Sequence, residues 1–161
     1  MISANQIKEL REKTGAGISD VKKALEESGG DMDKAEKWIE RKLGNAAVKK
    51  AGRETRAGLV DAYIHSNGRI GALVEIFCET DFVARNPAFK EFVHDIAMHI
   101  AAMHLLSSSP DAAEGDEVDF QTLLEQPFVK DQSKTVEQVL NEAIGRFGEN
   151  IKIGKFVRFE L

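Results

Sequence analysis

The first 45 residues alternate between short apolar stripes at helical spacing and clusters of turn-forming residues. This pattern predicts three short helices packed as a small bundle over residues 1–45. The predicted caps are Ser3 with Gln6 for the first helix, Ser19 or Asp20 for the second, and Asp31 or Asp33 for the third. A bundle of this size buries little surface, so we expect it to be only marginally stable alone.

The period changes from helical to alternating after residue 57. The stretch LVDAYIH, the turn at Asn67-Gly68 and the stretch RIGALVEIFC predict a β-hairpin. One face of the second strand is expected to be apolar and carries Ile70, Ala72, Val74, Ile76 and Cys78. Residues 44–56 are rich in alanine and in basic residues, and we expect residues 46–56 to form a helical or flexible linker without a core of its own.

The remaining residues predict helices interrupted by polar segments, with a strand at 151–161. A helix of about five turns begins at Asn86-Pro87, and an acidic polar loop follows at 107–119. A short helix near 120–126, an extended stretch at 126–131 and a helix capped by Thr135 come next. Gly154 marks a bulge in the last strand. Residues 57–161 are therefore predicted to form an α+β core, with about three antiparallel strands and helices on one face.

Composition and charge narrow the function classes. The chain has 161 residues, 42% of them hydrophobic and 30% charged, and no stretch approaches the length of about 18 apolar residues that spans a membrane. Its one cysteine allows no internal disulfide and fits a reducing compartment, so the cytoplasm is the expected location. Residues 1–56 hold 13 Lys and Arg against 10 Asp and Glu, and residues 57–161 hold 9 against 17. An acidic body does not suit direct nucleic-acid binding.

Residues that could carry metal or nucleophilic chemistry are too scattered to form a site. His94, His99 and His104 follow each other in five-residue steps, which turn about 140° on a helix and point three ways. We therefore expect neither a metal nor a cofactor. Cys78 alternates with apolar residues and is predicted to be a small buried side chain, although a nucleophilic role remains the alternative.

The segment CETDFVARN at 78–86 places Phe82 beside Asp81, on a connection between a predicted strand and a predicted helix. Phe82 could fold back onto the core, which is the usual fate of an aromatic residue on a connection. It could also project as a wedge toward a pocket on another protein. The pattern of residues leaves both open.

Several segments resemble the bacterial elongation factor Ts family. They are LREKTGAGISDVKKALEESGGDMDKA, IHSNGRIG, CETDFVARN, HDIAMHIAA, QPFVKDQSKTV and FVRFEL, and they occur in the family's order over essentially the whole chain. The resemblance implies that the three-helix unit has the fold of ubiquitin-associated domains. Longer members carry two core subdomains where this chain has one, which implies that this chain forms a homodimer. Val21 stands where many members have cysteine, so no thiol function belongs there.

The resemblance implies a non-enzymatic nucleotide exchange factor for the GTPase elongation factor Tu, without a cofactor, membrane or small-molecule substrate. The implied partner contacts are the wedge residues Thr80, Asp81, Phe82 and Val83, the N-terminal residues Gly15, Gly17, Ile18 and Val21, and the core-helix residues His94, Met98 and His99. Two rival hypotheses remain. The first is a module that binds a ubiquitin-like ligand through residues 1–45, and the second is an enzyme that uses Cys78.

Overall fold

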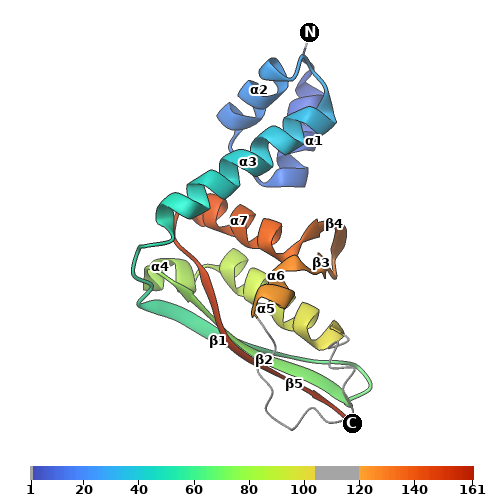
Figure 1. Ribbon diagram of the computed structural model, residues 1–161, viewed down its shortest axis with the longest axis vertical. Helices are drawn as coiled ribbons and strands as arrows, with labels where there is room; N and C mark the ends of the chain where they lie inside the picture. Colours follow the sequence, from blue (N-terminus) through green and yellow to red (C-terminus); the bar gives the residue numbers. More distant parts are fainter. Residues whose placement is uncertain (1, 104–119) are drawn as a thin grey trace.

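Three helices form the N-terminal end of the molecule (Figure 1). The structure is a computed structural model that describes residues 2–103 and 120–161. The three helices are α1 (Ala4–Thr14), α2 (Ile18–Glu27) and α3 (Met32–Lys50). Their own hydrophobic cluster comprises Leu10, Ala16, Val21, Ala24, Leu25, Ala35 and Ile39. This arrangement confirms the prediction of three N-terminal helices.

Two of the three predicted caps are confirmed. Ser3 and Gln6 form the capping box of α1, and the Asp31 side chain accepts a hydrogen bond from the backbone N–H of Lys34 in α3. The predicted cap of α2 is wrong, because that helix begins at Ile18 with Gly17 as its N-cap and has no side-chain cap. Asp20 instead lies in the first turn, where the partial positive charge of the helix N-terminus favours a carboxylate.

Helix α3 continues to Lys50, so the first residues of the predicted linker are helical. Ala47 is buried in the hydrophobic cluster of the α+β core, where α3 contacts α7 (Val136–Phe147). Leu43 lies against Gly145 so closely that a Cβ atom at position 145 would come within 2.4 Å of the leucine side chain. The C-terminal half of α3 therefore connects the N-terminal bundle to the α+β core and also packs against this core.

The core contains a three-stranded antiparallel sheet, as predicted. Strands β1 (Ala57–Ile64), β2 (Ile70–Cys78) and β5 (Lys152–Glu160) lie in the order β1-β2-β5. Val74 pairs with Phe156 and Ile76 with Ile153, so β5 has one extra residue between the two pairs. The bulge predicted at Gly154 is confirmed, and a Cβ atom there would lie 2.5 Å from the Phe77 ring.

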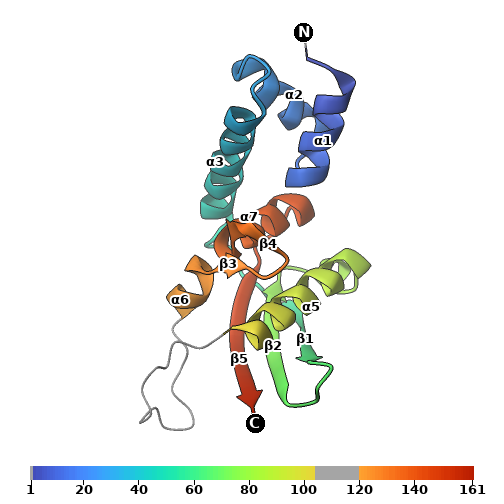
Figure 2. The same ribbon diagram turned by 90° about the vertical axis from the view of Figure 1, so that its right-hand side faces the viewer.

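Helices α5 (Pro87–Ala102) and α7 lie on the same side of this sheet (Figure 2). Asn86 caps α5, and Thr135 with Gln138 forms the capping box of α7, both as predicted. The apolar face predicted for β2 packs against these helices in one cluster, which includes Val74, Ile76, Phe89, Ile96, Ile100, Val136 and Ile151. The α+β fold class is confirmed.

Two short helices and a short hairpin connect the larger elements. The one-turn helix α4 (Asp81–Ala84) precedes α5, and α6 (Phe120–Glu125) confirms the short helix expected there. The hairpin of β3 (Pro127–Phe128) and β4 (Asp131–Thr135) follows α6. We predicted only one extended stretch there, because β4 is polar and lacks the apolar alternation that indicates a strand. The acidic loop predicted at 107–119 lies outside the described residues.

Candidate functional site

Helix α4 presents Phe82 to solvent. Thr80 is the N-cap of α4, and its side chain accepts a hydrogen bond from the backbone N–H of Val83. The Phe82 side chain is 84% exposed, whereas Val83 is 5% exposed and packs into the core. Of the two positions that the sequence left open for Phe82, the structure shows the outward one. A single helical turn thus points one apolar residue outward and the next one inward.

Asp81 borders two surface depressions, and Phe82 lines one of them. One depression is lined by Asp81, Phe82, Arg85, Asn86 and Pro87. The other is lined by residues of β1 together with Asp81, Ala84, Arg85 and Lys90. The carboxylate and the ring are both exposed and adjacent in sequence. An exposed apolar ring beside an exposed charge is suited to contact another protein.

The N-terminal candidate residues differ in their exposure. Gly15 ends α1 with φ at 67°, in the left-handed region that favours glycine, and its N–H donates to the carbonyl oxygen of Arg11. Ile18 is 47% exposed, whereas Val21 is fully buried in the helical bundle. Ile18 therefore offers an apolar surface at the start of α2. Val21 packs in the core of the helical bundle and supports the turn between α1 and α2.

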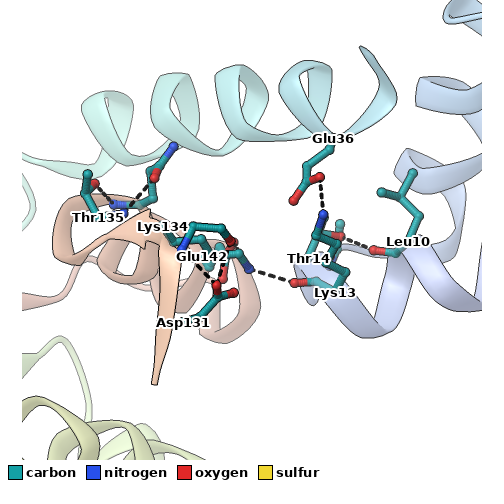
Figure 3. A network of polar contacts seen from close by, with 11 residues as sticks. Leu10, Lys13, Thr14, Glu36, Asp131, Lys134, Thr135 and Glu142 are labelled. Carbon is teal, nitrogen blue, oxygen red and sulfur yellow. Dashed lines mark hydrogen bonds and ion pairs between the residues drawn. The ribbon is translucent and has the colours of Figure 1, made fainter. Parts of the chain in front are cut away.

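A buried lysine joins this turn to the core (Figure 3). The Lys134 ammonium donates to the carbonyl oxygen of Lys13 at 2.7 Å and pairs with Glu142 Oε1 at 2.7 Å. Lys134 is only 7% exposed, and burial raises the pKa of the Glu142 carboxyl. On the other side of the contact, Lys13 pairs with Glu36 of α3 at 2.6 Å, which raises the pKa of Lys13. These contacts fix the N-terminal turn relative to β4 and α7.

The candidate residues of α5 point in different directions. His94 is exposed, and its Nδ1 lies 3.1 Å from Asp61 Oδ2 of β1. Met98 is half-buried. His99 is buried: its Nδ1 accepts a hydrogen bond from the Val129 N–H at 3.1 Å, which leaves Nε2 to donate to Gln126 Oε1 at 3.1 Å. His99 thus holds the β3–β4 hairpin and does not present its ring to a partner.

We expect His99 to make folding sensitive to mild acid. Burial lowers the pKa of its imidazole, so the unfolded chain takes up this proton more readily than the folded protein. The stabilisation is complete above the unfolded pKa of about 6.5 and is lost as the pH falls below it toward the folded pKa. The urea midpoint of the wild type should therefore drop between about pH 7.5 and about pH 5.5.

His99→Asn keeps an acceptor near the Val129 N–H but removes the titrating group. This variant should be less stable at both pH values and should show a smaller drop between them. The other histidines are common to both proteins, so the difference between the two drops belongs to His99. An equal drop in the variant would contradict the assignment.

The candidate metal ligands and the Cys78 thiol were also located in the structure. Within residues 2–103 and 120–161, no three His, Cys, Asp or Glu side chains gather as a metal site, and His104 lies outside this part of the chain. The Cys78 thiol is buried and donates to the carbonyl oxygen of Thr80 at 3.3 Å. Burial raises the pKa of this thiol, which keeps it in the less nucleophilic protonated form.

Comparison with known protein families covers the segments that carry the exposed candidate residues. The sequence model of the family "Elongation factor TS" matches residues 4–121, a range that includes the N-terminal turn, α4 and α5. The chain belongs to the elongation factor Ts family. Elongation factor Ts of Rubrobacter xylanophilus is 45% identical, over 97% of this chain and 97% of its own length. That of Acetivibrio thermocellus is 46% identical over 99% of this chain and 90% of its own length.

A longer relative matches equally well over a smaller share of its length. Elongation factor Ts of Cyanothece sp. PCC 7425 is 45% identical over 98% of this chain and 73% of its own length. That alignment runs over 192 residues, more than the 161 of this chain, so the relative has residues within it that this chain lacks. Membership of the elongation factor Ts family makes this chain a translation elongation factor. Among the described residues, none of the helices has the length and apolar character needed to cross a membrane.

Proposed function

We propose that the chain is a guanine-nucleotide exchange factor that binds elongation factor Tu in its GDP form and promotes GDP release. The observation that carries this proposal is the 84% exposure of Phe82, on a helix that lies within the residues matched to the family. The proposal places the protein in the cytoplasm, where translation takes place, without direct contact to nucleic acid.

The exchange reaction requires a change of affinity and no covalent step. A GTPase holds GDP through backbone amides around the phosphates and through a magnesium ion that offsets their charge. A protein that binds better to the conformation with these groups displaced speeds release, and by reciprocity GDP weakens its binding by the same factor. The exchange factor therefore needs docking surfaces and a wedge, and it needs no metal or cofactor of its own.

Within α4 we assign each residue a separate task. Phe82 inserts its ring between elements of the GTPase near the magnesium site, and Asp81 places a negative charge beside that site. Thr80 caps the helix and Val83 anchors it to the core. Burying a fully exposed Phe ring at the interface would stabilise the complex by about 1.5–3 kcal/mol, which offsets part of the binding free energy of the nucleotide.

A second set of contacts comes from the N-terminal turn and from α5. Gly15, Gly17 and the exposed Ile18 form the surface that we propose for the first of these contacts, and Val21 supports it from the bundle core. On α5, His94 and Met98 face the partner, whereas His99 acts indirectly through the β3–β4 hairpin.

The test is to load elongation factor Tu with a fluorescent GDP derivative and to time its release in a stopped-flow instrument with excess GDP. Added chain should accelerate release in a saturable manner. Release at the spontaneous rate would refute the proposal. Binding of a ubiquitin-like protein by residues 1–45, or loss of an activity on alkylation of Cys78, would support the rival hypotheses instead.

We also propose that two copies of the chain pair through the outer face of the sheet. Apolar side chains that are exposed on this face come from all three strands, and Leu73 of the central strand lies opposite Val157 of β5. The others are Val60, Ile64 and Phe159. In such a pair, the second copy of the chain would take the place of the second core subdomain of longer family members. This arrangement agrees with the homodimer that the resemblance implies.

Replacing Leu73 by lysine tests the pairing, because this side chain is exposed in one chain and would be buried between two. Light scattering should give the mass of two chains for the wild type and of one chain for the variant, with unchanged circular dichroism. Glu137→Lys, a charge change on α7 away from the sheet, is the matched control and should remain paired. A wild-type mass of one chain would refute the homodimer.

A further inference from the structure

The turn that follows α7 bonds to the residues that precede α4. The Glu149 carboxylate accepts three hydrogen bonds from these residues. Two come from the backbone N–H groups of Glu79 and Thr80, at 3.0 Å and 3.1 Å to Oε2. The third comes from the Thr80 hydroxyl, at 2.6 Å to Oε1. The carboxylate lies 69 residues further along the chain than Thr80.

These bonds act on the cap of α4. A one-turn helix does not hold its own shape in water, since its nucleation is unfavourable and little is gained by propagation. The Thr80 hydroxyl donates a hydrogen bond to Glu149. A lone pair of the hydroxyl oxygen is thereby left to accept the hydrogen bond from the Val83 N–H, at 3.4 Å. Glu149 therefore orients the capping hydroxyl, and the cap fixes the first turn that carries Phe82.

Asn150 extends the same contact to α3. Its backbone N–H donates to Glu79 Oε1 at 2.7 Å, and its side-chain amide donates to the carbonyl oxygens of Ala51 and Arg53 at 3.3 Å and 2.9 Å. Asn150 is only 2% exposed. Two adjacent residues thus join the base of the Phe82 turn to the end of the long helix from the N-terminal bundle.

We infer that Glu149 is a positioning residue for the exchange reaction: it holds the α4 turn so that Phe82 enters the GTPase in one fixed direction. This inference rests on the proposed function. A ring that projects into solvent on an unsupported turn would lose conformational freedom on docking, and this loss would weaken its effect on the nucleotide site. By holding the turn before docking, Glu149 avoids that loss.

The first test compares Glu149→Ala with Glu137→Ala, which removes an exposed carboxylate from the first turn of α7. Glu149→Ala should lower the maximal rate of GDP release about tenfold, the loss expected for removing charge-assisted hydrogen bonds. The half-saturating concentration should change much less, because the N-terminal contacts remain. Glu137→Ala should match the wild type. An unchanged maximal rate in Glu149→Ala would overturn the inference.

A double variant separates positioning from general destabilisation. If Glu149 acts through the ring, Glu149→Ala should cause no further loss in a Phe82→Ala background. An equal loss in both backgrounds would show that Glu149 acts elsewhere and would overturn the inference. Glu149→Gln keeps the side-chain volume and one acceptor oxygen, and it replaces Glu149→Ala in both assays if the alanine variant does not fold.

Hydrogen exchange in the free protein tests the positioning without the partner. The amides of Ala84, Arg85 and Asn86 bond within α4 and not to Glu149. Their exchange should be faster in Glu149→Ala than in the wild type, with protection in β2 and α5 unchanged. Unchanged exchange at these three amides would overturn the inference. If the wild type did not accelerate GDP release, the proposed function would fail, and this measurement would still decide whether Glu149 holds α4.

Discussion

Phe82→Ala is expected to slow the GDP release promoted by this chain by about one to two orders of magnitude, while the folded protein keeps its stability. The rate falls because the variant has no ring to insert into the GTPase, and the 1.5–3 kcal/mol estimated for its burial converts to roughly 10–100-fold. Stability is unaffected because the side chain is 84% exposed and supports no core contact. Substitutions at such surface positions usually change the free energy of unfolding by less than about 0.5 kcal/mol.

The measurement pairs stopped-flow release of fluorescent GDP with a thermal melt followed by circular dichroism. Phe82→Leu is the matched control, because it keeps an apolar side chain of similar reach and should retain part of the activity. If Phe82→Ala promoted release at the wild-type rate, the ring would not be the wedge. A large drop in melting temperature would show instead that the ring supports the fold.

Phe89→Ala, seven residues further along the chain, is expected to lower the stability of the fold and to leave the exchange activity of the folded protein in place. Phe89 is fully buried, and its ring meets the edge of the Phe147 ring with the centroids 5.6 Å apart. Deleting a buried aromatic ring costs about 3–5 kcal/mol, against a total stability of about 5–15 kcal/mol for a protein domain. The melting temperature should fall by about 10 °C or more. The fraction that remains folded should still promote GDP release, since α4 keeps its cap.

Urea unfolding at a temperature well below the melting transition measures the loss for Phe89→Ala. Phe89→Leu retains most of the buried volume and should recover more than half of the lost stability. A Phe89→Ala protein with the wild-type unfolding midpoint would contradict the core assignment. Together the two phenylalanines test whether the exposed ring serves binding and the buried one serves folding.

The sequence predicted the large elements because their signals are local. A few neighbouring residues are enough to indicate the start of a helix, as in the capping boxes at Ser3 and Thr135. The alternation of apolar residues in β2 indicates its buried face in the same way. The predicted N-cap of α2 is wrong because the N-cap residue, Gly17, has no side chain and so gives no capping signal in the sequence. The β3–β4 hairpin was missed because only Phe128 and Lys134 of its strands are buried.

The candidate site was predicted in part, and the remainder depends on contacts between distant segments. The CETDFVARN segment identified Phe82, but the outward direction of its ring depends on Val83 packing inward. The resemblance implies His99 as a partner contact, but the ring is buried under the β3–β4 hairpin, which the sequence did not predict. Glu149 was missed because it lies 69 residues from Thr80 and bonds mainly to backbone amides, which any residue type provides.

The order of these elements along the chain also determines when the contacts around α4 become complete during synthesis. Residues 78–86 emerge from the ribosome well before Glu149 and before β5, which covers the second edge of β2. Chains fold from the N-terminus as they emerge, so the three N-terminal helices can form first. A nascent chain that ends before Glu149 would already expose the Phe82 ring, yet its one-turn helix would lack the anchor that directs it. Under the proposed function, competence for exchange therefore arises late in the synthesis of the chain, after most of the proposed docking surface has been made.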